Sequence, residues 1–171
     1  MAKPRIAARD DDRGGDMPMV SAPPVEPIME KPDRKLHVLV AEDNEMNRVL
    51  ISRLLSRRGH LADLVVNGEE AVAAVQRKTY DLVLMDMHMP NMDGVTATMM
   101  IRGLTGPKRL VPIIALTGNA LAGQREGCLA AGMDDYLSKP FEAADFHAMI
   151  DRWHVAKQRP HSPGATVSPS E

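Results

Sequence analysis

The fold of this chain is decided by the segment LVLMDMHMPNMDG, residues Leu82–Gly94. Its first four residues are apolar and end at a carboxylate, Asp86, and a loop rich in Pro, Asn and Gly follows. An unbroken apolar run is typical of a strand buried on both faces, whereas a half-exposed strand alternates apolar and polar residues. The segment therefore predicts a central strand of a parallel sheet with helices on both faces.

Similar short apolar runs recur along the chain, and each is followed by a helical pattern. The predicted strands are Val38–Val40, Leu61–Val66, Leu82–Met85, Ile113–Leu116 and Tyr136–Ser138. The predicted helices run from Asn44 to Gly59, from Asn67 to Lys78, from Val95 to about Leu104, from Asn119 to Ala131 and from Glu142 to Trp153. The residues expected on one side of the first helix are Met46, Val49, Leu50, Leu54 and Leu55. With right-handed crossovers, this order predicts an open, doubly wound α/β sheet.

Proline marks the boundaries of the predicted domain. Of 13 prolines, six lie before Leu36 and three follow Val155. The composition of residues 1–35 and 157–171 predicts disordered tails, because such segments bury too little apolar surface to offset the entropy of ordering. The predicted domain is residues 36–156, a common size for one folded unit.

Composition excludes several classes of protein. The net charge of −2 gives no sign of a nucleic-acid partner. The single cysteine, Cys128, excludes an internal disulfide framework and a multi-cysteine metal site. The sequence has neither the apolar core of a signal peptide at its N-terminus nor an apolar run near the ~20 residues of a membrane-spanning helix. We therefore predict a cytoplasmic protein without membrane insertion.

Reactive side chains gather where the predicted strands end. Glu42 and Asp43 follow the first strand, Asp86 the third, Thr117 the fourth and Lys139 the fifth. Each residue alone has an ordinary structural explanation, such as a helix cap or a turn. However, the carboxyl ends of parallel strands share one edge of the sheet, where doubly wound folds bind their ligands.

The predicted cluster suits a metal ion and a phosphoryl group. Carboxylates brought together repel one another unless a cation joins them. The oxygens of Asp43 and Asp86, with a backbone carbonyl and waters, are the ligands that Mg²⁺ prefers, and Mn²⁺ is an alternative. Lys139 and Thr117 could hold the remaining phosphoryl oxygens. Asp86 is the best candidate for a nucleophile that forms an acyl phosphate, because it ends the most buried strand before an open loop.

Four motifs then resemble one family. Together the segments Val38–Arg48, Leu82–Gly94, Pro112–Ala120 and Gly132–Phe141 resemble the receiver domain of two-component response regulators, most closely the receivers of hybrid histidine kinases. The resemblance covers essentially all of Leu36–Trp153 and neither tail. It implies the flavodoxin-like (βα)5 fold with strand order 2-1-3-4-5.

The resemblance also implies roles for individual residues. Asp86 would be the phosphoacceptor, and its phosphoryl group would come from a kinase phosphohistidine. Asp43 and Asp86 would bind Mg²⁺ with the backbone carbonyl of His88, and Glu42 would act mainly through water. Lys139 would pair with the phosphoryl group. The His88 side chain either tunes dephosphorylation or has no chemical role beyond its carbonyl.

The same resemblance implies a conformational switch. Thr117 would turn toward a phosphoryl oxygen, the ring of Tyr136 would turn inward, and the bond between Lys139 and Pro140 would be cis. The face made by the fourth helix, fifth strand and fifth helix would then repack, and it could form a weak homodimer.

The expected partners are a histidine kinase and a histidine phosphotransfer protein. Whether the chain is a stand-alone regulator or the receiver of a hybrid kinase stays open, and a receiver that only docks to other proteins is the main rival. The spacing fits neither an aspartate phosphatase, because residue 88 is His, nor a P-loop, because GxxxxGK[ST] is missing. No separate enzymatic activity is expected beyond self-catalysed phosphorylation and dephosphorylation at Asp86.

Overall fold

The computed structural model describes residues 34–118 and 122–158. The predicted disordered tails and the predicted start of the fourth helix at Asn119 lie outside these ranges, apart from Arg34, Lys35 and residues 157–158. Five parallel strands form one sheet in the order β2-β1-β3-β4-β5. The strands are β1 (His37–Ala41), β2 (Leu61–Val65), β3 (Leu82–Asp86), β4 (Ile113–Thr117) and β5 (Asp135–Ser138). The predicted flavodoxin-like fold and strand order are confirmed.

The helices follow the strands in alternation. They are α1 (Glu45–Arg57), α2 (Gly68–Arg77), α3 (Gly94–Arg102), α4 (Ala122–Ala130) and α5 (Ala143–Gln158), with a short 3-10 helix η1 (Pro107–Leu110) before β4. The first three begin at Asn44, Asn67 and Asp93, whose side chains accept hydrogen bonds from backbone N–H groups of the first turn. Gly59 follows α1 with a φ of 78°, a conformation that glycine adopts readily, so the predicted end of this helix is confirmed.

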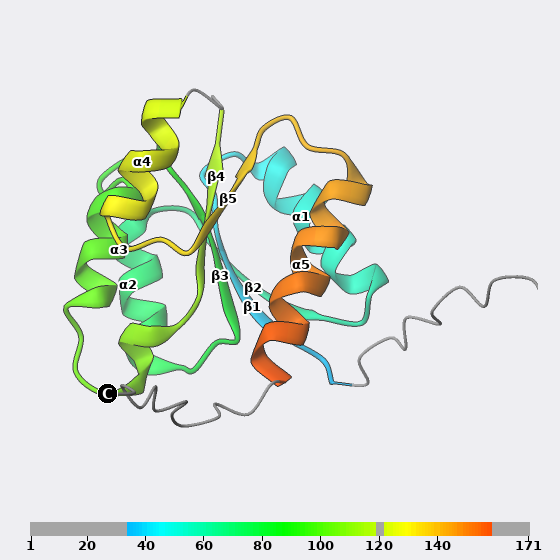
Figure 1. Cartoon of the computed structure of the whole chain (residues 1–171), viewed down its shortest axis with the longest axis horizontal. Helices are drawn as coiled ribbons and strands as arrows, with labels where there is room; N and C mark the ends of the chain where they lie inside the picture. Colours follow the sequence, from blue (N-terminus) through cyan, green and yellow to red (C-terminus); the bar gives the residue numbers. More distant parts are fainter. Residues whose placement is uncertain (1–33, 119–121, 159–171) are drawn as a thin grey trace, which may run out of the picture. The chain divides into compact units, whose positions relative to one another are not determined.

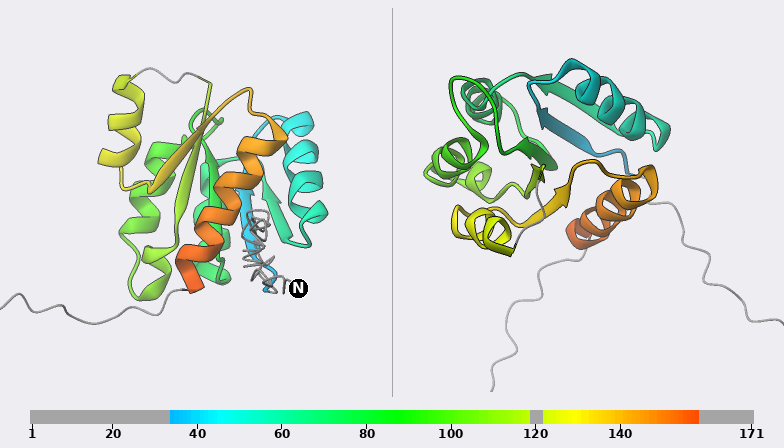
Figure 2. Two further views of the ribbon diagram at one scale, coloured as in Figure 1. Left: turned by 45° about the vertical axis from the view of Figure 1, so that its right-hand side comes forward. Right: turned by 90° about the horizontal axis from the view of Figure 1, so that it is seen from above.

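The helices cover both faces of the sheet (Figures 1 and 2). On one face α2, α3 and α4 pack against the sheet around residues such as Val83, Ile101 and Cys128. On the other face α1 and α5 pack around residues such as Leu84, Leu55 and Phe146. Successive side chains of β3 alternate between these two cores, which explains why an apolar residue is needed at each of its first four positions.

The recurring apolar runs of the sequence predict five strands that are all buried on both faces, and this prediction is wrong for the two edge strands. In β3 and β4 every residue is buried. β2 lies at one edge, where Leu61 is 56% exposed, and β5 lies at the other with all four residues half-buried. An edge strand has a neighbour on one side only, so fewer elements cover it.

The predicted inner face of α1 is also partly wrong. Ile51, Leu54 and Leu55 face the core, whereas Met46, Val49 and Leu50 are exposed, Met46 to 80%. The apolar residues of this helix thus form two groups, and only the group toward its C-terminal end lies against the sheet. Among the residues that the structure describes, no helix has both the length and the apolarity needed to cross a membrane.

Candidate functional site

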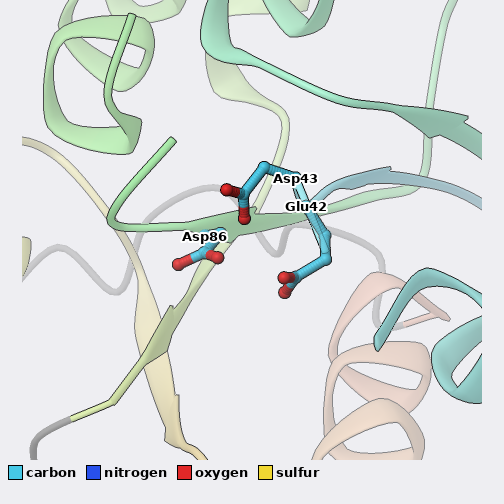
Figure 3. Close-up of side chains that lie close together, drawn as sticks. All are labelled: Glu42, Asp43 and Asp86. Atoms are coloured by element: carbon cyan, nitrogen blue, oxygen red, sulfur yellow. The ribbon is translucent and has the colours of Figure 1, made fainter. Parts of the chain in front are cut away.

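Three carboxylates meet at the carboxyl ends of the two central strands β1 and β3. Glu42 and Asp43 directly follow β1, and Asp86 is the last residue of β3, which pairs with β1. One carboxylate oxygen from each residue lies within 4.8 Å of the others (Figure 3). The three carboxylates that the sequence places at the strand ends therefore lie together in the structure.

Lys139 joins this cluster from the end of β5. Its Nζ lies 2.6 Å from Oε2 of Glu42 and 2.7 Å from Oδ2 of Asp86. The side chains of Glu42, Asp86 and Lys139 are 1%, 8% and 19% exposed, so solvent screens these ion pairs weakly. Burial disfavours the ammonium charge, but the hydrogen bonds to Asp86 and Glu42 outweigh it and raise the pKa of Lys139 above its ordinary value. The lysine is therefore a cation at neutral pH.

The acidic turn after β1, which consists of Glu42 and Asp43, is held by Asn47 and Arg48, two residues that the sequence motifs did not indicate. The side-chain amide of Asn47 and the backbone N–H of Asn44 donate to Oε1 of Glu42, at 3.0 and 3.3 Å. The guanidinium of Arg48 donates to the backbone carbonyls of Glu42 and Asp43, at 2.8 and 2.6 Å. The only available signal was helical spacing, since residues 47 and 48 lie in the first turns of α1 and can reach back to its N-terminus.

The loop after β3 folds back against Asp86. The backbone N–H of His88 donates to Oδ1 of Asp86 at 3.2 Å, and the His88 side chain is exposed. The backbone N–H of Gly94 donates to the carbonyl of Met87 at 3.2 Å. A Cβ atom on Gly94 would lie 2.1 Å from the backbone oxygen of Asp86, so this position requires glycine.

Thr117 and Tyr136 complete the set of predicted site residues. Thr117 is buried at the end of β4, and its carbonyl accepts a 2.6 Å hydrogen bond from the backbone N–H of Lys139. Tyr136 is half-buried on β5, where it pairs with Ala115 of β4 and packs against the core under α2, α3 and α4. The Lys139–Pro140 bond is cis, as the resemblance implied.

The residues present fit a divalent cation of the Mg²⁺ type. Such an ion takes one or two carboxylates together with waters and phosphate oxygens. Asp43 is exposed, so this carboxylate is open to an ion and its waters, while Asp86 supplies a second carboxylate next to it. Both oxygens of Glu42 already accept hydrogen bonds from protein groups, which makes it a less direct ligand than the other two.

Comparison with known families and proteins agrees with this geometry. The family model of the response regulator receiver domain matches residues 38–151. Hybrid signal transduction histidine kinase G of Dictyostelium discoideum is 42% identical over 122 residues, which are 70% of this chain. The chain spans 4% of the length of that kinase, so the similarity concerns one part of a much longer protein.

Solved structures show the same relationship. One is the receiver domain of a sensor histidine kinase from Pseudomonas aeruginosa PAO1, with a magnesium ion coordinated in its active-site cleft. It is 45% identical and has a TM-score of 0.65, and the match covers 70% of this chain and 98% of that one. Another is the receiver domain of Ssk1 from Saccharomyces cerevisiae, crystallised with the histidine phosphotransfer protein Ypd1. It is 26% identical with a TM-score of 0.69, over 75% and 94% of the two chains. This chain belongs to the response regulator receiver domain family of two-component and phosphorelay systems.

Proposed function

We propose that this receiver domain accepts a phosphoryl group on Asp86. One observation carries the proposal: a carboxylate at the end of the central strand lies 2.7 Å from the ammonium of Lys139 and within 4.8 Å of two further carboxylates. An ion pair made only for stability does not need three carboxylates around one lysine, because carboxylates at this distance repel one another. The surplus negative charge suits a divalent cation.

Asp43 and Asp86 would hold Mg²⁺, with the backbone carbonyl of His88 as a further ligand and Glu42 acting through water. When bound, the ion would neutralise charge on the phosphoryl oxygens and help to orient the group. The P. aeruginosa receiver, which coordinates magnesium in its active-site cleft, supports this choice of metal. Mn²⁺ has similar preferences for oxygen ligands and is a candidate substitute.

In the proposed reaction, an oxygen of Asp86 attacks the phosphorus of a phosphohistidine. The new O–P bond forms as the N–P bond breaks, and the electron pair of the broken bond stays on the imidazole nitrogen. Lys139 would leave its contact with the Asp86 oxygen and pair with a phosphoryl oxygen, which keeps the charge balanced through the transfer. Hydrolysis by water would later restore the carboxylate. The backbone N–H of His88 donates to Asp86, so the exposed His88 side chain would lie near the water that attacks and could influence that step.

We further propose that phosphorylation changes the face formed by α4, β5 and α5. Thr117 is the last residue of β4, the strand that pairs with β3 up to Asp86, and its backbone carbonyl accepts a hydrogen bond from the backbone N–H of Lys139. A phosphoryl group on Asp86 would therefore attract the Thr117 hydroxyl, and Tyr136 on the neighbouring strand could turn into the space that Thr117 leaves. The altered face is then available to an output partner or a second copy of the domain.

The phosphodonor would be a histidine kinase or a histidine phosphotransfer protein. The exposed residues Met46, Val49 and Leu50 on α1 form a surface next to the acidic turn, and apolar side chains in such a place favour contact with another protein. The crystallised complex of Ypd1 with the receiver of Ssk1 supports a partner of this class. Leu50→Ser should slow transfer from a purified phosphotransfer protein, while Leu129→Ser, at an exposed leucine of α4, should not.

A receiver that only docks to other proteins is the rival function, and a labelling experiment separates the two. The protein is incubated with acetyl phosphate and Mg²⁺, and bound phosphate is measured by intact-protein mass spectrometry. We expect one phosphoryl group on the wild type, none on Asp86→Asn and none when EDTA removes the metal. Asp93→Asn, which changes an exposed carboxylate at the start of α3, is the matched control and should label normally. Equal labelling of Asp86→Asn and the wild type would reject the proposal.

A further inference from the structure

A hollow of about 470 Å³ lies at the opposite end of the sheet from the acidic cluster. It is formed by the end of α2, the segment that leads from α2 to β3, and the segment with η1 that leads from α3 to β4. Since the strands are parallel, these segments lie at their amino ends, toward the bottom of Figure 1. We call this hollow the lower groove and define it by Val75, Lys78, Tyr80, Lys108, Leu110 and Val111, with further residues of the same segments.

The lower groove has an apolar base and an apolar lip. Val75, Tyr80 and Val111 are buried, and they belong to the same core as the central strands, so the base is fixed by the fold. Leu110 of η1 stands at the lip and is 71% exposed. A large apolar side chain that is exposed beside an apolar hollow leaves surface that a ligand could cover.

Two lysines border the lower groove, and the part of the chain that the structure describes contributes no acidic residue to its lining. The Nζ of Lys78 lies 2.8 Å from Oδ2 of Asp63, and the Nζ of Lys108 donates to the backbone carbonyl of Gln76 at the end of α2. An ammonium group has three donors, so each lysine can bond a ligand as well as its present partner. The partner of Lys108 is a neutral carbonyl, which leaves the positive charge of this lysine uncompensated by that contact.

Asp63 accepts hydrogen bonds from two lining residues on this side of the groove, Lys78 and Tyr80. Burial opposes its charge, but hydrogen bonds from Lys78, His37 and Tyr80 outweigh burial and lower the pKa of Asp63 to about 2. Asp63 therefore stays ionised at neutral pH, and it accepts a 2.8 Å hydrogen bond from the Tyr80 hydroxyl as well as the one from Lys78. Tyr80, which is also buried, is therefore held in place before any ligand arrives, which lowers the entropic cost of binding.

We propose that the lower groove binds a small amphiphilic anion, with an apolar body against Val75, Tyr80 and Val111 and an acidic group between Lys78 and Lys108. Its volume lies within the roughly 300–1,000 Å³ that is usual for small-molecule sites. No residue of the lower groove belongs to the acidic cluster, so both sites can be filled at once. The proposal therefore does not depend on phosphorylation of Asp86.

The test uses the fluorescent probe 8-anilino-1-naphthalenesulfonate, which combines an apolar ring system with one negative charge. Titration of the whole chain should give saturable one-to-one binding, with backbone amide NMR shifts confined to residues 75–80 and 105–112. Lys108→Met should weaken binding about tenfold, since a hydrogen bond between charged groups is lost. Thr105→Trp, which places a large side chain at the groove, should abolish it.

Matched controls separate the lower groove from general adhesion of the probe. Arg53→Met removes one exposed positive charge on α1, at the other face of the sheet, and should leave the affinity unchanged. The neutral analogue N-phenyl-1-naphthylamine should bind more weakly and should not respond to Lys108→Met. Asp86→Asn should bind the probe like the wild type. Circular dichroism melting checks that each variant folds. If Thr105→Trp does not fold, the affinity of Lys108→Met for the probe decides the test.

Three results would overturn the proposal. They are binding that does not saturate, NMR shifts centred outside the lower groove, and an equal affinity of Lys108→Met and Arg53→Met for the charged probe.

Discussion

Replacing Lys139 by methionine should destabilise the domain when no divalent cation is present. The variant keeps most of the side-chain volume but leaves Glu42 and Asp86 without the ammonium that now lies 2.6 and 2.7 Å away. Removing one partner of a fully buried ion pair costs about 3–5 kcal/mol. Lys139 is 19% exposed, and water can partly replace it, so we expect a loss of about 2–3 kcal/mol in the free energy of unfolding.

The assay is urea unfolding in EDTA, followed by the fluorescence of the single tryptophan, Trp153 on α5. The midpoint should fall while the slope with denaturant stays unchanged, because the folded domain buries the same surface. The pKa of Lys139 is raised in the folded state. Its contribution to the free energy of unfolding is therefore complete below the ordinary lysine pKa, and it is lost only as the pH rises through the raised pKa. The difference between variant and wild type should therefore be constant from about pH 6 to pH 9.

Lys78→Met is the matched control. Lys78 and Asp63 form an ion pair at 2.8 Å, but their side chains are 52% and 37% exposed. Pairs in contact with solvent contribute less than about 1 kcal/mol, so this variant should lose little stability. Equal losses for the two variants, or a loss below about 1 kcal/mol for Lys139→Met, would refute the claim that burial of the Glu42–Lys139–Asp86 group makes it important.

Three further changes test other parts of the structure. Asp43→Asn should weaken Mg²⁺ binding at least about tenfold by calorimetry, whereas Glu45→Gln, two residues away on α1, should have little effect. Gly94→Ala should lower the free energy of unfolding in urea by about 1–3 kcal/mol, because its Cβ would overlap the backbone oxygen of Asp86 at the end of β3. Gly127→Ala in α4 places its Cβ where it meets no atom, so it should raise the free energy of unfolding by about 0.5–1 kcal/mol. Stability should fall as the pH falls below 6.5, because burial lowers the pKa of the paired residues His60 and His154, and His154→Leu should reduce this dependence.

Both nitrogens of His154 are buried and have no hydrogen-bond partner among residues 34–118 and 122–158, so a charge on this ring would be poorly stabilised in the folded domain. Its ring centre lies 5.5 Å from that of His60, and the charged groups around the pair are Asp151, Arg58, Arg34 and Asp81, with His147 nearby. The unfolded chain binds protons more readily than this pair does, so acid favours unfolding. A pH dependence identical in wild type and His154→Leu would count against the pair as its cause.

Two results would contradict the predictions for Asp43→Asn and Gly94→Ala. Unchanged Mg²⁺ affinity in Asp43→Asn would remove this residue from the set of metal ligands. Similar stabilities of Gly94→Ala and Gly127→Ala would mean that the loop after β3 can move away from the Asp86 backbone.

The sheet could be predicted from sequence because its signals are local. An unbroken apolar run such as residues 82–85 is compatible with few structures other than a strand covered on both faces. The parallel topology then brings the last residue of each strand to one edge, which is why Asp86 and Lys139 could be expected together although 53 residues separate them.

What the sequence did not reveal depends on packing between distant elements. Met46 and Ile51 are both apolar residues of α1, but the position of this helix over the sheet decides that only Ile51 is buried. The meeting of His60 with His154 likewise requires that the end of α5 lies near the end of α1. The contacts of Asn47 and Arg48 with the acidic turn depend on side-chain conformations that spacing alone does not determine.

Borohydride reduction shows whether Asp86 itself carries the phosphoryl group. Sodium borohydride converts an aspartyl phosphate to homoserine, which peptide mass spectrometry assigns to one position. After incubation with acetyl phosphate and Mg²⁺, we expect homoserine at position 86 and at neither position 43 nor position 93. Homoserine at another carboxylate, or none at position 86 in protein that has taken up phosphate, would show that Asp86 is not the phosphoacceptor.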